Sequence, residues 1–148
     1  MPIPDLNSHG LLPSGVHDCS IPEIEAQFGW NGHRAGLLSD FKICFKNEIH
    51  VNFPYPLFFD GSFVTDKENP DDIDVVLDLC NVPDSTKYQG LMFMQQNQAR
   101  LMSKYRVHFW INLPGNNDFC GFFQYVGVKT AKFKGLDPKF LKGILRLP

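Results

Sequence analysis

Two aspartates, Asp72 and Asp74, stand at the start of the clearest strand pattern in the chain, "DIDVVLDL" (72–79). Side chains alternate between the two faces of a strand, so both carboxylates point one way while Ile73 and Val75 point into a core. Two carboxylates this close repel each other, and without a partner one of them takes up a proton. A divalent cation, Mg²⁺ or Mn²⁺, resolves the conflict because it prefers oxygen ligands. The pair alone also fits a strand end at which both groups are solvated.

A glycine–serine pair, Gly61 and Ser62, directly follows a short predicted strand, "PYPLFFD" (54–60). Glycine lets the backbone approach a ligand closely, and backbone N–H groups with a serine hydroxyl can cradle an anion. Lys67 lies in the polar loop that follows, where it could neutralise a phosphate or simply be solvated. A phosphate cradle shortly before a metal-binding pair is a joint signal that neither half gives alone.

The order strand, Gly61–Ser62, spacer and Asp72-x-Asp74 in the next strand resembles the nucleotidyltransferase domain of the DNA polymerase beta superfamily. The motif and its flanks resemble those of minimal single-domain bacterial nucleotidyltransferase-like proteins. The resemblance spans residues 33–112 by element order, and its specific part is 57–77. It implies an α+β, nucleotidyltransferase-like fold, a small mixed β-sheet with helices packed against it. It also implies that Gly61 and Ser62 hold the β- and γ-phosphates of a nucleotide. Asp72 and Asp74 would bind Mg²⁺ (or Mn²⁺) and set the α-phosphate for in-line attack.

The chain departs from the superfamily at the third carboxylate, which the following strand usually supplies. The matching strand here is "YRVHFWI" (105–111), and His108 stands about where that acid is expected. A neutral histidine could act as the base that takes the proton of the attacking hydroxyl. It equally fits a core or surface histidine in a domain that has lost catalysis. Asp118, in the next loop, is a second candidate for the missing acid.

The function that the resemblance implies is that of a minimal Mg²⁺-dependent nucleotidyltransferase. Such an enzyme transfers a nucleoside monophosphate from a nucleoside triphosphate, expected to be ATP, to a hydroxyl of a protein or RNA. Some relatives belong to toxin–antitoxin or phage-defence modules, so a partner protein encoded nearby is expected to serve as acceptor or to complete the site. One alternative is a module that keeps the fold and binds nucleotide or a partner without catalysis. A structural protein with a solvated acidic strand end is another.

The elements that must position these residues follow from local patterns. Ser20 and Glu23 have the spacing of a capping box, which predicts a short helix ending near Gly29. Apolar residues at helical spacing predict a second helix over 33–51. The stretch before Ser20 is predicted to be loop. Asp84 or Ser85 is expected to cap a long helix that ends near Lys104. The remaining predictions are a strand over 106–113, a helix over 119–127, whose aromatic content also permits a strand, and a closing segment over 142–147.

The composition is that of one globular domain: 148 residues, of which 43% are hydrophobic and 20% charged. We expect a single domain over 1–148, with an N-terminal helical segment (1–32), the motif core (33–112) and a basic C-terminal tail (129–148). The net charge is -2, yet the tail carries six basic residues and one acid. This asymmetry fits a tail that faces phosphates and equally fits a solvated segment.

The four cysteines are scattered, with no CxxC pair among them. This spacing argues against a zinc ribbon and against a disulfide framework, and reduced thiols favour a cytoplasmic location. The N-terminus lacks the basic and apolar regions of a signal peptide. No apolar run is long enough to cross a bilayer, so no membrane partner is expected.

Overall fold

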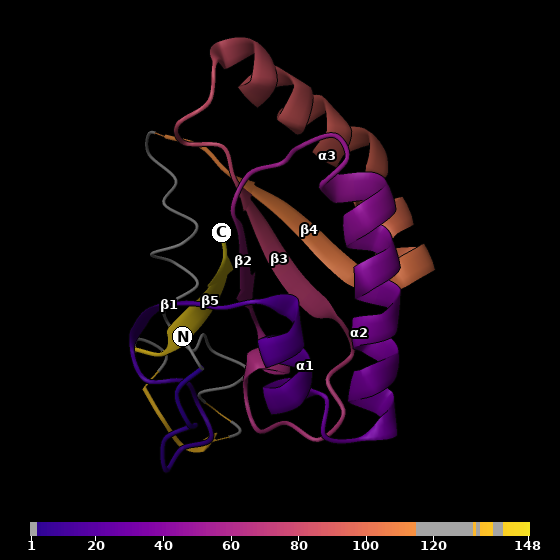
Figure 1. The fold of residues 1–148 in the computed structure, drawn as a ribbon. Helices are drawn as coiled ribbons and strands as arrows, with labels where there is room; N and C mark the ends of the chain where they lie inside the picture. Colours follow the sequence, from indigo (N-terminus) through magenta and orange to yellow (C-terminus); the bar gives the residue numbers. More distant parts are fainter. Residues whose placement is uncertain (1–2, 115–131, 133, 138–140) are drawn as a thin grey trace.

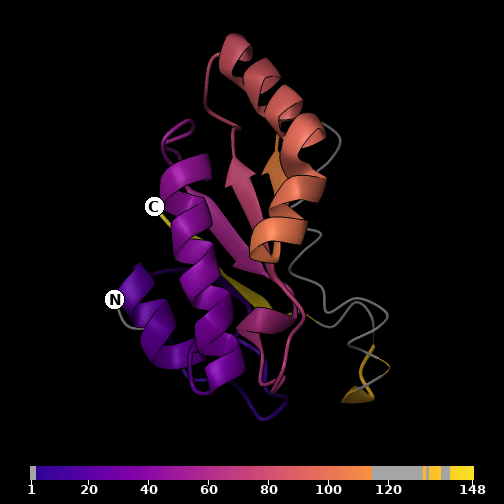
Figure 2. The ribbon, with the colours of Figure 1, turned by 90° about the vertical axis from the view of Figure 1, so that its right-hand side faces the viewer.

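The structure, a computed structural model, describes residues 3–114, 132, 134–137 and 141–148. Within these residues the fold is α+β, with a five-stranded mixed sheet and three α-helices that lie on one face of it (Figures 1 and 2). The elements are β1 (Gly15–Asp18), α1 (Ile21–Phe28), α2 (Gly32–Cys44), the π-helix η1 (Phe45–Ile49), β2 (Leu57–Asp60), the 3₁₀-helix η2 (Ser62–Val64), β3 (Ile73–Asp78), α3 (Asp84–Tyr105), β4 (Val107–Asn112) and β5 (Gly143–Leu147).

The sheet has the strand order β1-β5-β2-β3-β4. β3 and β4 are parallel, as are β1 and β5, whereas β2 is antiparallel to both of its neighbours. The two ends of the chain therefore meet, because β5 is hydrogen-bonded to β1 on one side and to β2 on the other. This corrects two expectations: residues 15–18 are a strand and not loop, and residues 143–147 of the expected tail lie inside the sheet.

The main core lies between the sheet and the helices, and it follows the alternation of each strand. Residues with odd numbers in β2, β3 and β4 are buried on the helix-covered face, among them Phe59, Val75 and Phe109. Residues with even numbers face the other way, where Phe58, Val76 and Ile144 form a small second cluster. The even-numbered Asp74 and His108 therefore belong to the face that the α-helices do not cover.

The first helix confirms its prediction in detail. The backbone N–H of Glu23 donates to Ser20 Oγ at 3.4 Å, and the N–H of Ser20 donates to Glu23 Oε1 at 3.0 Å. This reciprocal capping box satisfies donors that would otherwise be orphaned at the start of α1. Pro22 lies in the first turn, where its missing N–H costs nothing.

Two helix boundaries differ from the sequence prediction. The second helix is regular only to Cys44 and continues as the π-helix η1, in which the N–H of His50 reaches Phe45 O at 2.7 Å. The wider turn carries Glu48 toward α3, where it accepts hydrogen bonds from Arg100 and Tyr105. α3 begins after Pro83 without a side-chain cap, so neither Asp84 nor Ser85 is the N-cap.

Other expectations concern the membrane, the cysteines and the segment after β4. Among the described residues, no helix combines the length and the apolar character that crossing a membrane requires. Cys19, Cys44 and Cys80 are free thiols. The helix predicted over 119–127 and the candidate acid Asp118 lie outside the described residues.

Candidate metal and phosphate site

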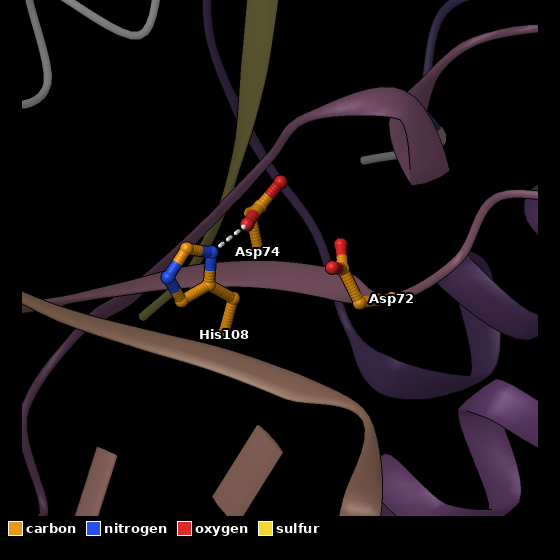
Figure 3. Close-up of side chains that lie close together, drawn as sticks. All are labelled: Asp72, Asp74 and His108. Carbon is orange, nitrogen blue, oxygen red and sulfur yellow. Dashed lines mark hydrogen bonds and ion pairs between the residues drawn. The ribbon is translucent and has the colours of Figure 1, made fainter. Parts of the chain in front are cut away.

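Asp72, Asp74 and His108 come together on the face of the sheet that α1, α2 and α3 do not cover (Figure 3). Asp72 directly precedes β3, Asp74 is the second residue of β3, and His108 is the second residue of β4. The parallel register sets Asp74 opposite His108. One ligand atom from each of the three side chains can be chosen so that all lie within 4.8 Å of one another. The two strands thus gather the two predicted carboxylates and the predicted histidine in one cluster.

Asp74 lies in an environment that disfavours its negative charge. Burial, followed by the nearby charge of Asp72, raises the pKa of the Asp74 carboxyl to about 6. His108 opposes this shift, since its Nδ1 lies 3.0 Å from Asp74 Oδ1. A pair of carboxylates whose charges conflict in this way is the arrangement that a bound cation relieves.

Gly61 brings the glycine–serine turn against this cluster. Its φ is +76°, a conformation that residues with a Cβ rarely adopt. A Cβ at this position would lie 1.9 Å from Asp74 Oδ2, which is far inside contact distance. Asp60, the residue before it, lies opposite Asp74 in the antiparallel register of β2 and β3. The structure therefore brings together the two halves of the sequence motif, and glycine is required where they meet.

The turn and the carboxylates line a hollow of about 750 Å³. Lys67, predicted to be near the phosphates, lines it too, as do Lys132 and Lys134 from the C-terminal part of the chain. Lys134 Nζ lies 2.7 Å from Asp66 Oδ1. The full lining is Gly61, Ser62, Thr65, Asp66, Lys67, Asp71, Asp72, Asp74, Lys132 and Lys134. Carboxylates and ammonium groups thus share one cavity, which suits a ligand that carries both metal ions and phosphates.

The basic residues of the expected C-terminal tail divide into two groups. Lys132 and Lys134 line the hollow, and a phosphate-facing role for this part of the tail stays a prediction. Lys142 is buried against Asp60, and Arg146 pairs with Asp18 through contacts of 2.7 and 2.9 Å. Lys129 and Lys139 lie outside the described residues.

Arg34, on α2, shapes the loop that lines the hollow, and sequence reasoning missed it. Its guanidinium is completely buried and donates to the carbonyl oxygens of Phe28, Phe63, Thr65 and Lys67 at 2.6–3.1 Å. It also stacks 3.7 Å from the centroid of the Trp30 ring. Burial lowers the pKa of Arg34 to about 10, which still leaves it charged near neutrality. A signal was present, because Arg34 falls in register with the apolar face of Leu37, Leu38 and Phe41.

The donor set of the cluster fits a divalent cation. Two carboxylates can supply the oxygen ligands that Mg²⁺ prefers, while the remaining positions suit water and phosphate oxygens. An imidazole is a better ligand for Mn²⁺ than for Mg²⁺. His108 can instead stay outside the coordination sphere and orient the Asp74 carboxylate through its Nδ1 contact. Asp72 and Asp74 are therefore the residues that would hold the metal.

The fold and the site define an α+β domain with an aspartate–histidine cluster beside a hollow that also holds lysines. The chain belongs to a family of unknown function, DUF6932, whose model matches residues 4–148. Comparison with curated proteins and with solved structures gave no match. The family assignment thus covers nearly the whole chain without supplying a function.

Proposed function

We propose that this protein is a minimal Mg²⁺-dependent nucleotidyltransferase with a nucleotidyltransferase-like fold. It transfers a nucleoside monophosphate from a triphosphate, ATP by preference, to a hydroxyl of a protein or RNA. The hydroxyl oxygen bonds to the α-phosphorus, the bond between the α- and β-phosphates breaks, and pyrophosphate leaves. The observation that carries the proposal is the convergence of Gly61–Ser62 with Asp72 and Asp74 on one hollow of about 750 Å³. A solvated strand end does not require a glycine pressed against the second aspartate, so this contact favours a built site over a merely acidic surface.

In this proposal two kinds of side chain in the hollow bind the triphosphate: carboxylates, through the cation, and hydroxyl or ammonium groups, directly. Asp72 and Asp74 would hold the cation, which when bound would supply positive charge against the phosphates of the triphosphate. The Ser62 hydroxyl donates to the terminal phosphates, and Lys67, Lys132 and Lys134 lie in the same cavity as their counter-charges. Positioning and charge neutralisation supply most of the rate enhancement of phosphoryl-type transfer, so few reacting side chains are needed.

His108 is the proposed proton acceptor in place of the usual third carboxylate. When Asp74 is ionised, the Nδ1–H of His108 donates to Asp74 Oδ1, which leaves a lone pair on Nε2. This is the carboxylate–imidazole arrangement that orients a histidine base in other enzymes. His108 would take the proton of the acceptor hydroxyl through Nε2, either directly or through one water.

A second candidate function is that of a module without catalytic activity. Such a module binds either a nucleotide or a partner protein and transfers no nucleotide group. The observation that favours it is the same contact: His108 is fixed to Asp74 in place of a third acid. A histidine that only orients Asp74 would support cation and nucleotide binding but no proton transfer. Toxin–antitoxin or phage-defence roles, with a partner protein encoded nearby, are compatible with both candidates.

The deciding experiment is label transfer from α-³²P nucleoside triphosphates in the presence of Mg²⁺. The four triphosphates are tested separately, and bacterial protein and RNA fractions serve as acceptors. We expect labelled protein or RNA with ATP, and no label with Asp72→Asn or Asp74→Asn. Asp78→Asn is the matched control, because Asp78 lies on the same strand but bonds to the backbone N–H of Cys80 at 3.1 Å and does not line the hollow.

The same experiment separates the two candidates. His108→Asn is expected to keep Mg²⁺-dependent nucleotide binding and to lose at least about a hundredfold in transfer rate, the usual contribution of a general base. Binding of labelled nucleotide without transfer to any acceptor supports the inactive module instead. The absence of both nucleotide binding and transfer contradicts the enzyme and the nucleotide-binding module, and leaves only a module that binds a partner protein.

A further inference from the structure

A buried ion pair, Asp60 with Lys142, lies next to the hollow. Lys142 Nζ contacts Asp60 Oδ1, and the two side chains are only 6% and 4% exposed, respectively. Asp60 ends β2, and Lys142 stands directly before β5, the neighbour of β2 in the sheet. Removing two charges from water is costly, and apolar residues of similar size can often replace a buried pair without loss of stability. A contribution to folding stability therefore does not by itself account for the presence of this buried ion pair.

Asp60 connects the two halves of the candidate site. It directly precedes Gly61 in the chain, and it lies opposite Asp74 in the register of β2 and β3. Burial raises the pKa of the Asp60 carboxyl, and Lys142 and the backbone N–H of Gly61 oppose this shift by favouring the carboxylate. Gly61 in turn packs so closely on Asp74 that a Cβ would fit only if the Asp74 carboxylate moved. A shift of the Asp60 carboxylate would therefore move the turn relative to the metal-binding aspartates.

Lys142 is the group that holds the Asp60 carboxylate in place. It also offsets a negative charge that would otherwise add to those of Asp72 and Asp74, and such charges interact strongly where water is excluded. Neither Asp60 nor Lys142 lines the hollow. The pair is thus placed to act on a ligand through Gly61 and Asp74 and not by contact.

We propose that the Asp60–Lys142 pair is a positioning unit that holds the Gly61–Ser62 turn in register with Asp72 and Asp74. Its effect on metal binding rests on the proposed function, whereas its effect on the turn does not. The C-terminal segment thereby contributes to the site twice, through the lysines in the hollow and through Lys142 beside it. The outer groups that orient metal-binding residues commonly change metal affinity about 10–100-fold when they are removed.

The test uses an apolar double variant, Asp60→Leu with Lys142→Met. Each single substitution leaves one buried charge unpaired, so we expect the melting temperature to fall by about 10 °C or more. The double variant removes one charge of each sign and keeps the net charge, so its melting temperature is expected within about 5 °C of the wild type. Any change that the double variant shows at the site then reports the position of the Gly61–Ser62 turn and not a loss of overall stability.

Two readouts are taken on the double variant. Hydrogen exchange of the backbone amides over residues 60–65 needs no metal and is expected to become at least about tenfold faster, because the turn is released. Binding of Mn²⁺ alone, by calorimetry, is expected to weaken about 10–100-fold. The matched control is Asp18→Leu with Arg146→Met, which removes another ion pair that involves β5 but lies away from the hollow. It is expected to change neither readout.

The outcomes keep the two proposals apart. If the double variant is stable and both readouts match the wild type, the pair is merely structural and the inference is overturned, while the metal site stands. If the wild type binds no Mn²⁺, the proposed function fails, and the exchange of residues 60–65 still decides whether the pair positions the turn.

Discussion

At the scale of single residues, Gly61 sets the distance between the turn and the aspartates. Gly61→Ala would place a methyl group 1.9 Å from Asp74 Oδ2 and force φ away from +76°. With ψ at -165°, Gly61 lies in a backbone region that is essentially confined to glycine, and holding a residue with a Cβ there costs about 1–3 kcal/mol before the clash is counted. We expect Mn²⁺ affinity, measured by calorimetry, to fall at least tenfold, as is roughly typical when the groups around a metal site are displaced.

Gly36→Ala is the control for this prediction. Gly36 lies inside α2, and the nearest group to an added Cβ is Arg106 Nη2 at 3.7 Å, an ordinary contact. Alanine favours helix over glycine by up to about 1 kcal/mol, so this variant should be as stable as the wild type or more so. Equal Mn²⁺ affinities for the two variants would refute the role given to Gly61.

Asp74 gives a pH dependence of stability in the metal-free protein. Its pKa is about 6 in the folded state against 3.8 for the unfolded chain, so between these values the folded state holds more protons. Stability contributed by this group is therefore lost as pH rises through about 6. From pH 5 to pH 7 the loss amounts to about 1 kcal/mol.

Urea unfolding in EDTA checks this sign. The free energy of unfolding of Asp74→Asn, minus that of the wild type, should be larger at pH 7 than at pH 5, because asparagine carries no charge to bury. The difference between variants removes the contributions of titrating groups that do not interact with Asp74, such as Glu48. An unchanged difference at the two pH values would show that the Asp74 pKa is not raised.

At the scale of elements, Arg34 joins α2 to the loop that lines the hollow. Arg34→Met would leave the carbonyl oxygens of Phe63, Thr65 and Lys67 without this donor. Each buried carbonyl that loses a charged donor costs about 1–3 kcal/mol of stability. We therefore expect the free energy of unfolding, measured by urea titration, to fall by at least about 3 kcal/mol. Lysine should not substitute, because it lacks the planar fork of donors.

Lys42→Met, on the same helix, is the matched control. Lys42 forms an exposed ion pair with Glu25 at 3.1 Å, and such pairs contribute about 0–1 kcal/mol. A similar loss for both variants would mean that Arg34 acts as an ordinary surface charge.

The elements that the sequence predicted well are those whose signal is local. β3 has an unbroken alternation, and α1 carries both halves of its capping box, so each was recognisable without the rest of the chain. β1 was missed because residues 15–18 alternate between half-buried and exposed side chains and form a strand only by pairing with β5. The π-helix was missed because its wider turn accompanies contacts between Glu48 and residues of α3. Those residues are distant from Glu48 in the sequence, so no local pattern indicates the wider turn.

The candidate site follows the same division. Asp72, Asp74, Gly61 and Ser62 converge as strand alternation and register require, so this part could be predicted from the motif. The pairing of Asp60 with Lys142 joins residues 82 positions apart, and no local pattern indicates it. Lys132 and Lys134 could be counted as basic, but only the fold of the chain end shows that they face the hollow.

At the scale of the whole molecule, β5 makes the chain end part of the core. Leu145 is completely buried on the helix-covered face, whereas Leu147, at the end of the strand, is only partly buried. Leu145→Ala should cost about 2–5 kcal/mol, as for other large-to-small core changes. Leu147→Ala should cost clearly less in the same urea titration. Near-zero effects for both would fit a solvated tail and would contradict the position of β5.

The central claim is that Asp72 and Asp74 hold a divalent cation at the hollow, and calorimetric titration with Mn²⁺ tests it most directly. The measurement compares the wild type with Asp72→Asn, Asp74→Asn and Asp78→Asn, all near pH 7.5, where the Asp74 carboxyl is ionised. We predict saturable binding to the wild type and to Asp78→Asn, with binding lost in the other two variants. No saturable binding to the wild type, or equal weakening by all three substitutions, would contradict the account.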